Sequence, residues 1–513
     1  MHWTMTDPYV DKILNANVYD VATKTPLTHA PSLSERLGCD VHLKREDLQP
    51  IFSFKCRGAY NKMSSLTEEE RARGVVAASA GNHAQGVALA AQKLGVDATI
   101  VMPVTTPSIK VDAVKRRGAN VVLQGDAFDQ ASEFASRLVV ERGATYLHPF
   151  DDPDVIAGQG TVGLEVSRQL PSPADYVFIP CGGGGLLSGM AVFLKHVWPE
   201  VTVIGVEPAD AACALAARQN SERVTLDSVG LFADGCAVAR VGKETHRVIE
   251  QYVDDIITAS TDEMCAAVKD IFEDTRAIAE PAGALAIAGM KTYLAEHDLT
   301  GKRVVAVLSG ANTNFDRLRY ISERTDIGER REAVLSVTIP EEPGAFRAFC
   351  RTIGKRNITE FNYRAGSNTD ARVFVGLTVV PQSQDVTDLT GNLEHRGYSV
   401  VDLTDNEMAK LHVRHMIGGQ LIATGSKEQV FRVEFPERPG ALMTFLDALG
   451  SEFNISMFHY RNHGAAYGRI LVGFTGAEGF GVPLIATLNG IGFRYWEESE
   501  NPAYREYLKP IDL

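Results

Sequence analysis

Short apolar runs alternate with helix-like stretches through the first 325 residues, and this alternation limits the possible fold more than any other feature. The runs expected to form buried strands are residues 74–78, 98–102, 120–123, 176–179, 201–206 and 304–308, and helical patterns fill residues 84–94, 107–117 and 127–142. Strands that alternate with helices are typical of βαβ units around a parallel sheet. Residues 1–325 therefore predict one large α/β domain, with a small lobe at roughly residues 50–150.

A repeated pattern follows a charged segment at residues 321–331. Residues 339–346 match residues 435–442, and residues 361–364 match residues 458–461. Each copy has the order strand, Pro-Gly turn, helix, strand, which predicts two copies of one small α+β module and argues against a solenoid. We place these modules at residues 332–425 and 426–513.

Composition disfavours several classes of partner. The chain of 513 residues has a formal net charge of −14 at pH 7, which disfavours nucleic acid and anionic membranes. No apolar run approaches the roughly 18 residues of a membrane span, and residues 1–10 lack the pattern of a signal peptide. The seven cysteines are scattered and lack a C-x-x-C motif, so we expect a reducing, cytoplasmic location without disulfides or a zinc site.

Lys55 is the candidate nucleophile. It follows residues 43–50, which are dense in charges of both signs, and it lies between Phe54 and Cys56, where the sequence turns apolar. Most lysines are exposed, so a surface lysine is the alternative interpretation. A buried lysine loses its proton more easily, and a neutral amine can attack a carbonyl carbon.

Four consecutive glycines, residues 182–185, stand between an expected strand and a helix that begins at Leu186. Glycines let a ligand approach the backbone closely and present several N–H groups, so the run predicts a phosphate site, with a flexible connection as the alternative. A dinucleotide fold with Glu207 as the ribose-binding acid is a second functional possibility. Leu187 weakens it, because G-x-G-x-x-G requires glycine at that position.

Two more loops follow expected strands. Residues 79–83 precede a helix, where Ser79 and free N–H groups could bind a carboxylate and Asn82 could donate to a phenolic oxygen, although a helix cap is the simpler interpretation. His83 is most simply a packed or capping residue. Ser309 follows the last buried strand, at the edge where open α/β sheets bind ligands, and a turn serine is its alternative.

Together these motifs resemble the fold-type II family of pyridoxal-phosphate enzymes, and more closely the threonine dehydratases. The matching pieces are residues 53–59, 79–86, 182–185, 280–283 and 309–312, while the C-terminal repeat resembles the paired ACT-like regulatory domains of the biosynthetic enzymes. The resemblance implies a two-lobed, parallel-sheet catalytic domain followed by an α+β regulatory domain of two ACT-like modules. It also implies pyridoxal 5′-phosphate as cofactor and a homotetramer.

The resemblance assigns roles by position. It implies that Lys55 is the Schiff-base lysine and the catalytic residue, that Asn82 contacts the ring hydroxyl, and that Ser309 contacts the pyridine nitrogen. The implied phosphate loop consists of Gly182, Gly183, Gly184, Gly185 and Leu186. The implied substrate-carboxylate loop consists of Ser79, Gly81, Asn82 and His83.

The implied reaction is the deaminating dehydration of L-threonine to 2-oxobutanoate and ammonia, and of L-serine to pyruvate. It is the first step of isoleucine biosynthesis, and the doubled module implies inhibition by isoleucine that valine relieves. Four residues that recur in both copies are candidates for effector binding or, as an equal alternative, for holding the modules together: Tyr363, Arg364, Tyr460 and Arg461.

Two positions at which the chain differs from related enzymes narrow the range of expected activities and ligands. Serine racemases carry a serine where Ala80 stands, so racemisation is not expected. Eukaryotic relatives bind a metal after the strand that ends at Glu207, but Cys213 replaces the expected acid, so no divalent metal is expected. The alternatives are another fold-type II enzyme acting on serine or threonine, a dinucleotide-dependent oxidoreductase, and a non-catalytic amino-acid sensor.

Overall fold

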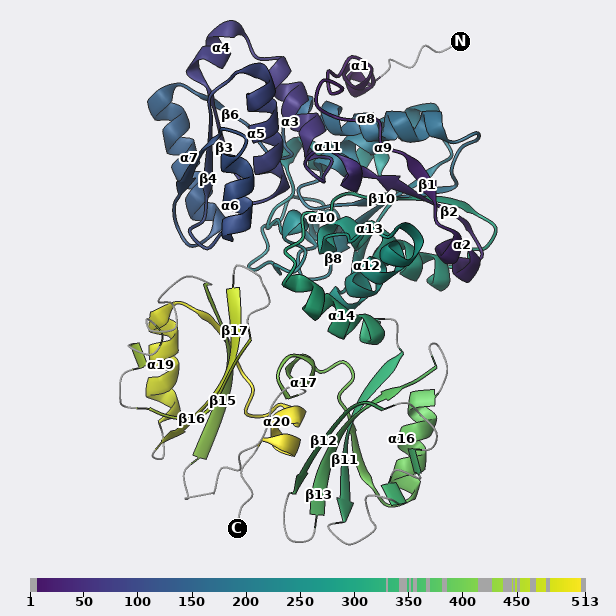
Figure 1. The fold of residues 1–513 in the computed structure, drawn as a ribbon, viewed down its shortest axis with the longest axis vertical. Coiled ribbons are helices and arrows are strands. Elements are labelled where there is room, and N and C mark those ends of the chain that lie inside the picture. Colours follow the sequence, from purple (N-terminus) through teal and green to yellow (C-terminus); the bar gives the residue numbers. More distant parts are fainter. Residues whose placement is uncertain are drawn as a thin grey trace. The chain divides into compact units, whose positions relative to one another are not determined.

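The computed structural model divides the chain into two compact units, residues 1–325 and 326–513 (Figure 1). The described residues are 7–328, 331–340, 348–349, 352–353, 358–365, 370–380, 385–413, 427–436, 445, 448–449, 453–461, 467–476 and 480–508. In this part of the chain, no helix is long and apolar enough to cross a membrane.

The larger lobe of the first unit contains a six-stranded sheet of order β1-β2-β10-β7-β8-β9. Its strands are β1 (Leu27–His29), β2 (Asp40–Arg45), β7 (Tyr176–Pro180), β8 (Thr202–Pro208), β9 (Asp255–Ala259) and β10 (Arg303–Leu308). All neighbours are parallel except β1 and β2. In β10, Val304 and Ala306 pack into one hydrophobic cluster, whereas Val305 and Val307 pack into another. Both faces are therefore covered, which explains why the buried strands are apolar at consecutive positions.

Helices and two short 3-10 turns surround this sheet. They are α1 (Pro8–Leu14), α2 (Pro31–Leu37), η1 (Glu46–Leu48), α8 (Pro153–Gln169), α9 (Gly185–Val197), α10 (Cys213–Asn220), η2 (Asp234–Cys236), α11 (Lys243–Tyr252), α12 (Thr261–Thr275), α13 (Pro281–Glu296) and α14 (Arg317–Gly328). Sequence signals fix several of their starts. In α8, the Asp152 side chain accepts hydrogen bonds from two first-turn N–H groups and Pro153 occupies the first helical position.

The small lobe has its own parallel sheet of order β5-β4-β3-β6. It comprises β3 (Val75–Ala78), β4 (Ala98–Met102), β5 (Asn120–Leu123) and β6 (Thr145–Tyr146), with α3 (Lys55–Ser64), α4 (Glu68–Arg73), α5 (Asn82–Leu94), α6 (Ser108–Lys115) and α7 (Phe128–Arg142). Side chains of α5 and α6 pack on one face, and those of α7 on the other. The predicted two-lobed parallel architecture is confirmed. Because β2 precedes this lobe but pairs with β10, the small lobe is inserted into the larger sheet's chain path.

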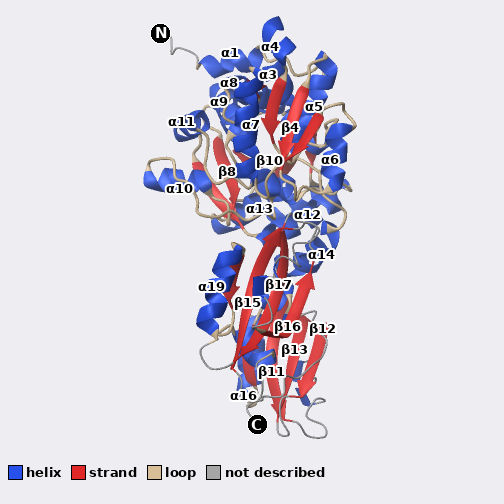
Figure 2. Ribbon diagram, turned by 90° about the vertical axis from the view of Figure 1, so that its left-hand side faces the viewer, coloured by secondary structure: helices blue, strands red, loops and turns tan. Residues whose placement is uncertain are grey.

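The second unit contains two four-stranded antiparallel sheets with equivalent orders, β12-β13-β11-β14 and β16-β17-β15-β18. The long strands β11, β13, β15 and β17 are drawn as red arrows in Figure 2. The first comprises β11 (Glu332–Pro340), β12 (Ile358–Ala365), β13 (Asp370–Thr378) and β14 (Ser399–Asp402). The second comprises β15 (Lys427–Pro436), β16 (Asn454–Arg461), β17 (Tyr467–Gly476) and β18 (Arg494–Glu497). The helices are α16 (Asp385–His395), α17 (Glu407–Leu411), α19 (Gly481–Ile491) and α20 (Pro502–Tyr507). The repeated α+β module predicted from the sequence is confirmed.

The two modules share a hydrophobic core. Val334 and Phe374 from the first sheet join Val430 and Leu471 from the second, and Tyr504 of α20 completes the cluster. The predicted Pro-Gly turns, residues 343–344 and 439–440, lie outside the described residues.

Candidate active site

Lys55 is the first residue of α3. Its Nζ donates a hydrogen bond to the backbone oxygen of Pro149 at 3.0 Å and lies 5.2 Å from the centre of the Phe54 ring. Burial lowers the pKa of Lys55 to about 8, against the opposing influence of Cys236 and Glu280. A substantial fraction of the amine is therefore neutral in mildly alkaline solution, which is the state that a nucleophile needs.

The segment before Lys55 is tied to the end of β10. The backbone N–H of Phe54 donates to the oxygen of Ser309 at 3.3 Å, and the N–H of Ala311 donates to the oxygen of Phe52 at 2.9 Å. These bonds bring the start of α3 and the end of β10 together. Lys55 and Ser309, which lie in different sequence motifs, consequently belong to one site.

Ser309 is buried at the carboxyl end of β10, the sheet edge at which the sequence predicts ligand binding. Its hydroxyl group donates to the backbone oxygen of Ala282, near the start of α13, at 3.3 Å. The hydroxyl oxygen retains acceptor capacity, and the group can rotate toward another partner. Its contact with a pyridine nitrogen stays a prediction.

Asn82 is the first residue of α5 and is held from two sides. Its Nδ2 donates to Oε1 of Glu280 at 2.6 Å, and its Oδ1 accepts from Nδ2 of Asn312 at 2.6 Å. The amide nitrogen has a second hydrogen, so donation to a ring hydroxyl stays a prediction. Burial, reinforced by Asp234, raises the pKa of Glu280 to about 7. The sequence interpretation placed Glu280 in a motif but gave it no role.

The loop of residues 79–83 presents backbone donors. The Ser79 hydroxyl accepts hydrogen bonds from the N–H groups of Gly81 at 3.2 Å and Ala84 at 3.3 Å, which is the simpler capping role expected for it. A Cβ atom on Gly81 would meet no atom within 4 Å, so space lies open beside the loop. Carboxylate binding by this loop stays a prediction.

His83 is a packed residue, as the simplest interpretation of the sequence predicts. Its Nε2 lies 2.9 Å from the backbone oxygen of Leu147, so Nε2 carries the proton, and Nδ1 has no partner among the described residues. Burial, reinforced by Lys55, lowers the pKa of His83 to about 3. The ring is therefore neutral at physiological pH, and its contact with substrate stays a prediction.

The glycine loop, residues 182–185, connects β7 to α9. Gly184 has a φ of +93°, which favours glycine, and a Cβ atom on Gly183 would lie 2.2 Å from the Phe150 ring. Gly183, Gly184 and Gly185 are buried, yet none of their N–H groups donates a hydrogen bond within the described part of the chain. Buried, unpaired N–H groups at a helix start suit an anion such as a phosphate.

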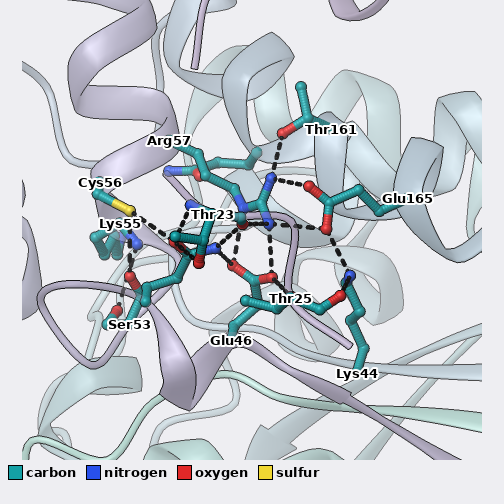
Figure 3. A network of polar contacts seen from close by, with 12 residues as sticks. Thr23, Thr25, Lys44, Glu46, Ser53, Lys55, Cys56, Arg57, Thr161 and Glu165 are labelled. Atoms are coloured by element: carbon teal, nitrogen blue, oxygen red, sulfur yellow. Dashed lines mark hydrogen bonds and ion pairs between the residues drawn. The ribbon is translucent and has the colours of Figure 1, made fainter. Parts of the chain in front are cut away.

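A buried ionic network surrounds Arg57, two residues after Lys55 (Figure 3). Arg57 is completely buried and donates from Nε to Glu46 at 2.8 Å and from Nη1 to Glu165 at 2.7 Å. Lys44 donates from Nζ to the other oxygen of Glu165 at 2.6 Å. The positive charges of Arg57 and Lys44 balance the negative charges of the two glutamates. Although burial opposes ionisation, Arg57 lowers the pKa of Glu46. The sequence interpretation gave Arg57 no role.

Glu207 is engaged within the protein. It is completely buried, and its carboxyl oxygens accept hydrogen bonds from the N–H groups of Ala214 at 2.9 Å and Leu215 at 2.8 Å, at the start of α10. Burial raises the pKa of Glu207 to about 7. These contacts occupy the acid that the dinucleotide interpretation requires for ribose, and so they remove the main support for that interpretation.

Residues 147–151 were missed on the sequence, although they contact several parts of the site. They follow β6, so the rule that singled out Ser309, a position at the carboxyl end of a parallel strand, also applies to them.

The four candidate effector residues lie on β12 and β16, but their side chains lie outside the described residues: Tyr363, Arg364, Tyr460 and Arg461.

Comparisons with known proteins agree with this geometry. Residues 18–310 match the family described as pyridoxal-phosphate dependent enzyme, and residues 323–413 and 420–508 match the C-terminal regulatory domain of threonine dehydratase. The chain is 50% identical over 503 residues to L-threonine dehydratase biosynthetic IlvA of Burkholderia multivorans, covering 98% of this chain and 99% of that protein. The Escherichia coli protein of the same name is 51% identical over 501 residues, covering 98% and 97%.

The chain belongs to the threonine dehydratase family of pyridoxal-phosphate dependent enzymes. Among solved structures, the processed form of threonine deaminase isoform 2 from Solanum lycopersicum is similar with a TM-score of 0.61 and 48% identity, covering 62% of this chain and 88% of that one. Maize serine racemase is similar with a TM-score of 0.58 and 31% identity, covering 61% and 95%. The predicted fold class, family and cofactor are confirmed.

The residues of this site fit the family's cofactor. The N–H groups of the glycine loop, which have no partner among the residues that the structure describes, suit a phosphate, and the Lys55 amine suits an aldehyde. The Asn82 amide and the Ser309 hydroxyl supply polar partners for a ring. All four elements belong to the first unit.

Proposed function

We propose that this chain catalyses the deaminating dehydration of L-threonine to 2-oxobutanoate and ammonia, and of L-serine to pyruvate. The observation that carries the proposal is the match, along nearly the whole chain, to proteins named biosynthetic L-threonine dehydratase. Two further observations support it independently: a lysine of lowered pKa, and a glycine loop whose N–H groups have no partner in the described part of the chain. Neighbouring residues, Pro149 and Phe150, contact Lys55 and Gly183.

Lys55 would hold the cofactor covalently, and the glycine loop with Leu186 would hold its phosphate. Asn82 would donate to the ring hydroxyl, and Ser309 would face the pyridine nitrogen. When bound, pyridoxal phosphate supplies an aldehyde for the substrate amine and a ring that accepts electrons from the Cα bonds. A neutral hydroxyl, in place of a carboxylate, leaves the pyridine nitrogen without a proton, which favours elimination over transamination.

The protein's own groups then bind substrate and move protons. The loop of Ser79, Gly81, Asn82 and His83 binds the substrate carboxylate at the start of α5. The N–H groups of Asn82 and His83 have no partner within the described residues and supply the donors, whereas that of Gly81 donates to Ser79. Lys55, as a neutral amine, removes the proton from the substrate Cα. The β-hydroxyl group then leaves with a proton as water, and the released enamine tautomerises to an imine. One water molecule hydrolyses the imine, which releases ammonia and leaves the 2-oxo acid. Ala80 has no proton to give to the opposite face of Cα, so we do not propose racemisation.

Replacing Lys55 with Ala tests the assignment. We expect the rate of 2-oxobutanoate formation to fall at least a thousandfold, on the order expected when an essential catalytic group is lost. Borohydride treatment should attach cofactor mass to the Lys55 peptide of the unmodified chain and to no peptide of K55A. Lys62 lies on the same helix and forms ion pairs at the surface, so K62A is the matched control. Near-normal kcat in K55A would overturn the proposal.

We also propose feedback regulation by the second unit: isoleucine inhibits the enzyme, valine relieves the inhibition, and the reaction opens isoleucine biosynthesis. The match of both modules to the threonine dehydratase regulatory domain supports this. Arg364 and Arg461 are proposed to hold the effector carboxylate, with Tyr363 and Tyr460 beside them. We expect R364A or R461A in the full-length enzyme to raise the isoleucine concentration for half-inhibition about tenfold, the effect of a lost charged hydrogen bond. Unchanged inhibition in both variants would remove the assignment.

Further proposals concern location, assembly and domain limits. We propose a cytoplasmic enzyme, supported by the six described cysteines, which are all buried free thiols: Cys39, Cys56, Cys181, Cys213, Cys236 and Cys265. We propose a homotetramer, which light scattering on the purified protein would test. We propose domain limits at residues 1–325, 332–425 and 426–513. Limited proteolysis followed by mass spectrometry should give fragments that begin and end near these limits.

A further inference from the structure

Three consecutive residues, Pro149, Phe150 and Asp151, each contact a different part of the candidate site. The backbone oxygen of Pro149 accepts the hydrogen bond from Lys55 Nζ at 3.0 Å. The Phe150 ring fills the space beside Gly183, where an added Cβ atom would lie 2.2 Å from the ring. Asp151 holds the start of α11. One short segment therefore connects the lysine to the supports of the glycine loop.

Asp151 fixes the first turn of α11 through three backbone hydrogen bonds. Its carboxyl oxygens accept from the N–H groups of Lys243 at 2.8 Å, Glu244 at 2.8 Å and Thr245 at 3.2 Å. A carboxylate at this position satisfies N–H groups that have no partner within the helix and interacts favourably with the helix dipole. Asp151 thereby sets the position of Thr245.

Thr245 joins this helix start to the glycine loop. Its side chain is completely buried, and its hydroxyl group donates to the backbone oxygen of Gly183 at 2.7 Å. The N–H of Gly242 also points to that oxygen, at 3.4 Å. The backbone oxygen of Thr245 in turn accepts from the hydroxyl of Ser188, on the first turn of α9, at 3.2 Å. The loop and both neighbouring helix starts are thus bonded to one residue.

The bond from Thr245 determines where the loop's donors point. In a trans peptide, the C=O of one residue and the N–H of the next point in opposite directions. Fixing the oxygen of Gly183 toward Thr245 consequently directs the N–H of Gly184 to the opposite side. That N–H group and those of Gly183 and Gly185 are the buried donors without a partner in the described part of the chain. Thr245 therefore orients one of the donors that suit an anion, the N–H group of Gly184.

We infer that Thr245, held by Asp151, is a positioning residue that arranges the glycine loop for the cofactor's phosphate group. The inference rests on the proposed assignment of residues 182–185 as the phosphate loop. Thr245 touches neither the ring nor the substrate in this role. It acts through the Gly183 peptide, so its loss weakens recognition of the phosphate group and leaves recognition of the ring and aldehyde intact.

The experiment compares two ligands that differ only in the phosphate. Full-length protein freed of cofactor is titrated with pyridoxal phosphate and with pyridoxal, and the change in absorbance gives each Kd. Thr245→Val removes the hydroxyl at nearly constant shape, whereas Thr245→Ser retains it. The control is T325V, because Thr325 is also a buried threonine whose hydroxyl donates to a backbone oxygen, that of Ile321 at 2.8 Å on α14.

We expect T245V to raise the Kd of pyridoxal phosphate about tenfold, the effect of one lost buried hydrogen bond, with the Kd of pyridoxal changed less than about twofold. T245S and T325V should prefer pyridoxal phosphate over pyridoxal as strongly as the unmodified chain does. D151N should also reduce this preference, because an amide offers one acceptor oxygen where the carboxylate offers two.

The possible outcomes distinguish a failure of the inference about Thr245 from a failure of the proposed phosphate loop. If T245V weakens both ligands equally, or neither, Thr245 has only a structural role and the inference is wrong. If the unmodified chain itself shows no preference for pyridoxal phosphate over pyridoxal, the assignment of the glycine loop is wrong. Inorganic phosphate gives a second readout: it should raise the melting temperature of the cofactor-free chain and raise it less in T245V.

Discussion

Asn82 and Glu280 lie 198 positions apart in the chain, yet Nδ2 of Asn82 donates to Oε1 of Glu280 at 2.6 Å. One residue begins α5 in the small lobe, and the other precedes α13 in the larger lobe. Each lobe thus supplies one partner of a hydrogen bond at the candidate site. Burial raises the pKa of Glu280 and the hydrogen bond from Asn82 lowers it, so the contact between the lobes affects the protonation of this carboxyl group.

The Glu280 carboxyl group should make stability depend on pH in a predictable direction. Burial and Asp234 raise its pKa to about 7. Between about pH 4.5 and 7, the folded carboxyl keeps a proton that the unfolded one has lost, so this group's contribution to stability falls as pH rises, by up to about 1.4 kcal/mol per pH unit. The stability difference between the unmodified, cofactor-free chain and E280Q, followed by urea unfolding, should fall over this range and level off above it. A difference independent of pH would contradict the prediction.

The Lys55 amine should react with aldehydes according to its lowered pKa. Burial lowers that pKa to about 8, and the neutral amine is the nucleophile. The rate at which cofactor-free protein takes up pyridoxal phosphate should therefore rise about tenfold per pH unit below pH 8 and level off above it. A stopped-flow absorbance series from pH 6 to 10 measures this. A rate that continued to rise to pH 10 would indicate an ordinary lysine.

Loss of Arg57 should destabilise the first unit strongly. Arg57→Met leaves the buried carboxylates of Glu46 and Glu165 with only Lys44 as a neighbouring cation in the network. Breaking a buried ion pair from one side costs about 3–5 kcal/mol. K12M removes an exposed pair with Asp154 and should cost less than about 1 kcal/mol. Equal urea-unfolding midpoints for R57M and K12M would show that the network contributes little.

The central strands were predictable because they are covered on both faces. The apolar runs at residues 98–102 and 304–308 became β4 and β10, whereas β5, which lies at the predicted residues 120–123, is only partly buried. The assignment of the strands to two separate sheets was harder to predict from the sequence, because β2 precedes the small lobe in the chain but pairs with β10. Register between strands far apart in sequence depends on tertiary packing, which local patterns do not contain.

Candidate site residues could be chosen from the sequence where backbone chemistry favours a particular residue type. A glycine run and a strand end singled out the loop at 182–185 and Ser309, whose roles stay predictions. The sequence interpretation missed groups that act through long-range contacts, such as Thr245 on Gly183 and Asp151 on α11. Arg57 was missed because nothing local to it shows that Glu46 and Glu165 converge on its guanidinium group.

Gly81 should be a position where an added methyl group disturbs the substrate and leaves the fold intact. A Cβ atom there would meet no protein atom within 4 Å, and the adjoining N–H groups are the proposed carboxylate donors. Gly81→Ala should therefore keep the melting temperature within about 2 °C, as expected of a substitution without a steric conflict. The KM for L-threonine should rise about tenfold, since carboxylate binding would be impaired.

Gly86→Ala, on the helix α5 that Gly81 precedes, provides the contrast. Its Cβ atom would lie 2.9 Å from the backbone oxygen of Lys55, so α3 and α5 would have to separate. Overpacking of this kind costs about 1–3 kcal/mol, and G86A should lower the melting temperature as well as kcat, because Lys55 itself moves. If G81A lowered the melting temperature as much as G86A does, the space beside Gly81 would not be open. If G81A left the KM unchanged, the substrate carboxylate would bind elsewhere.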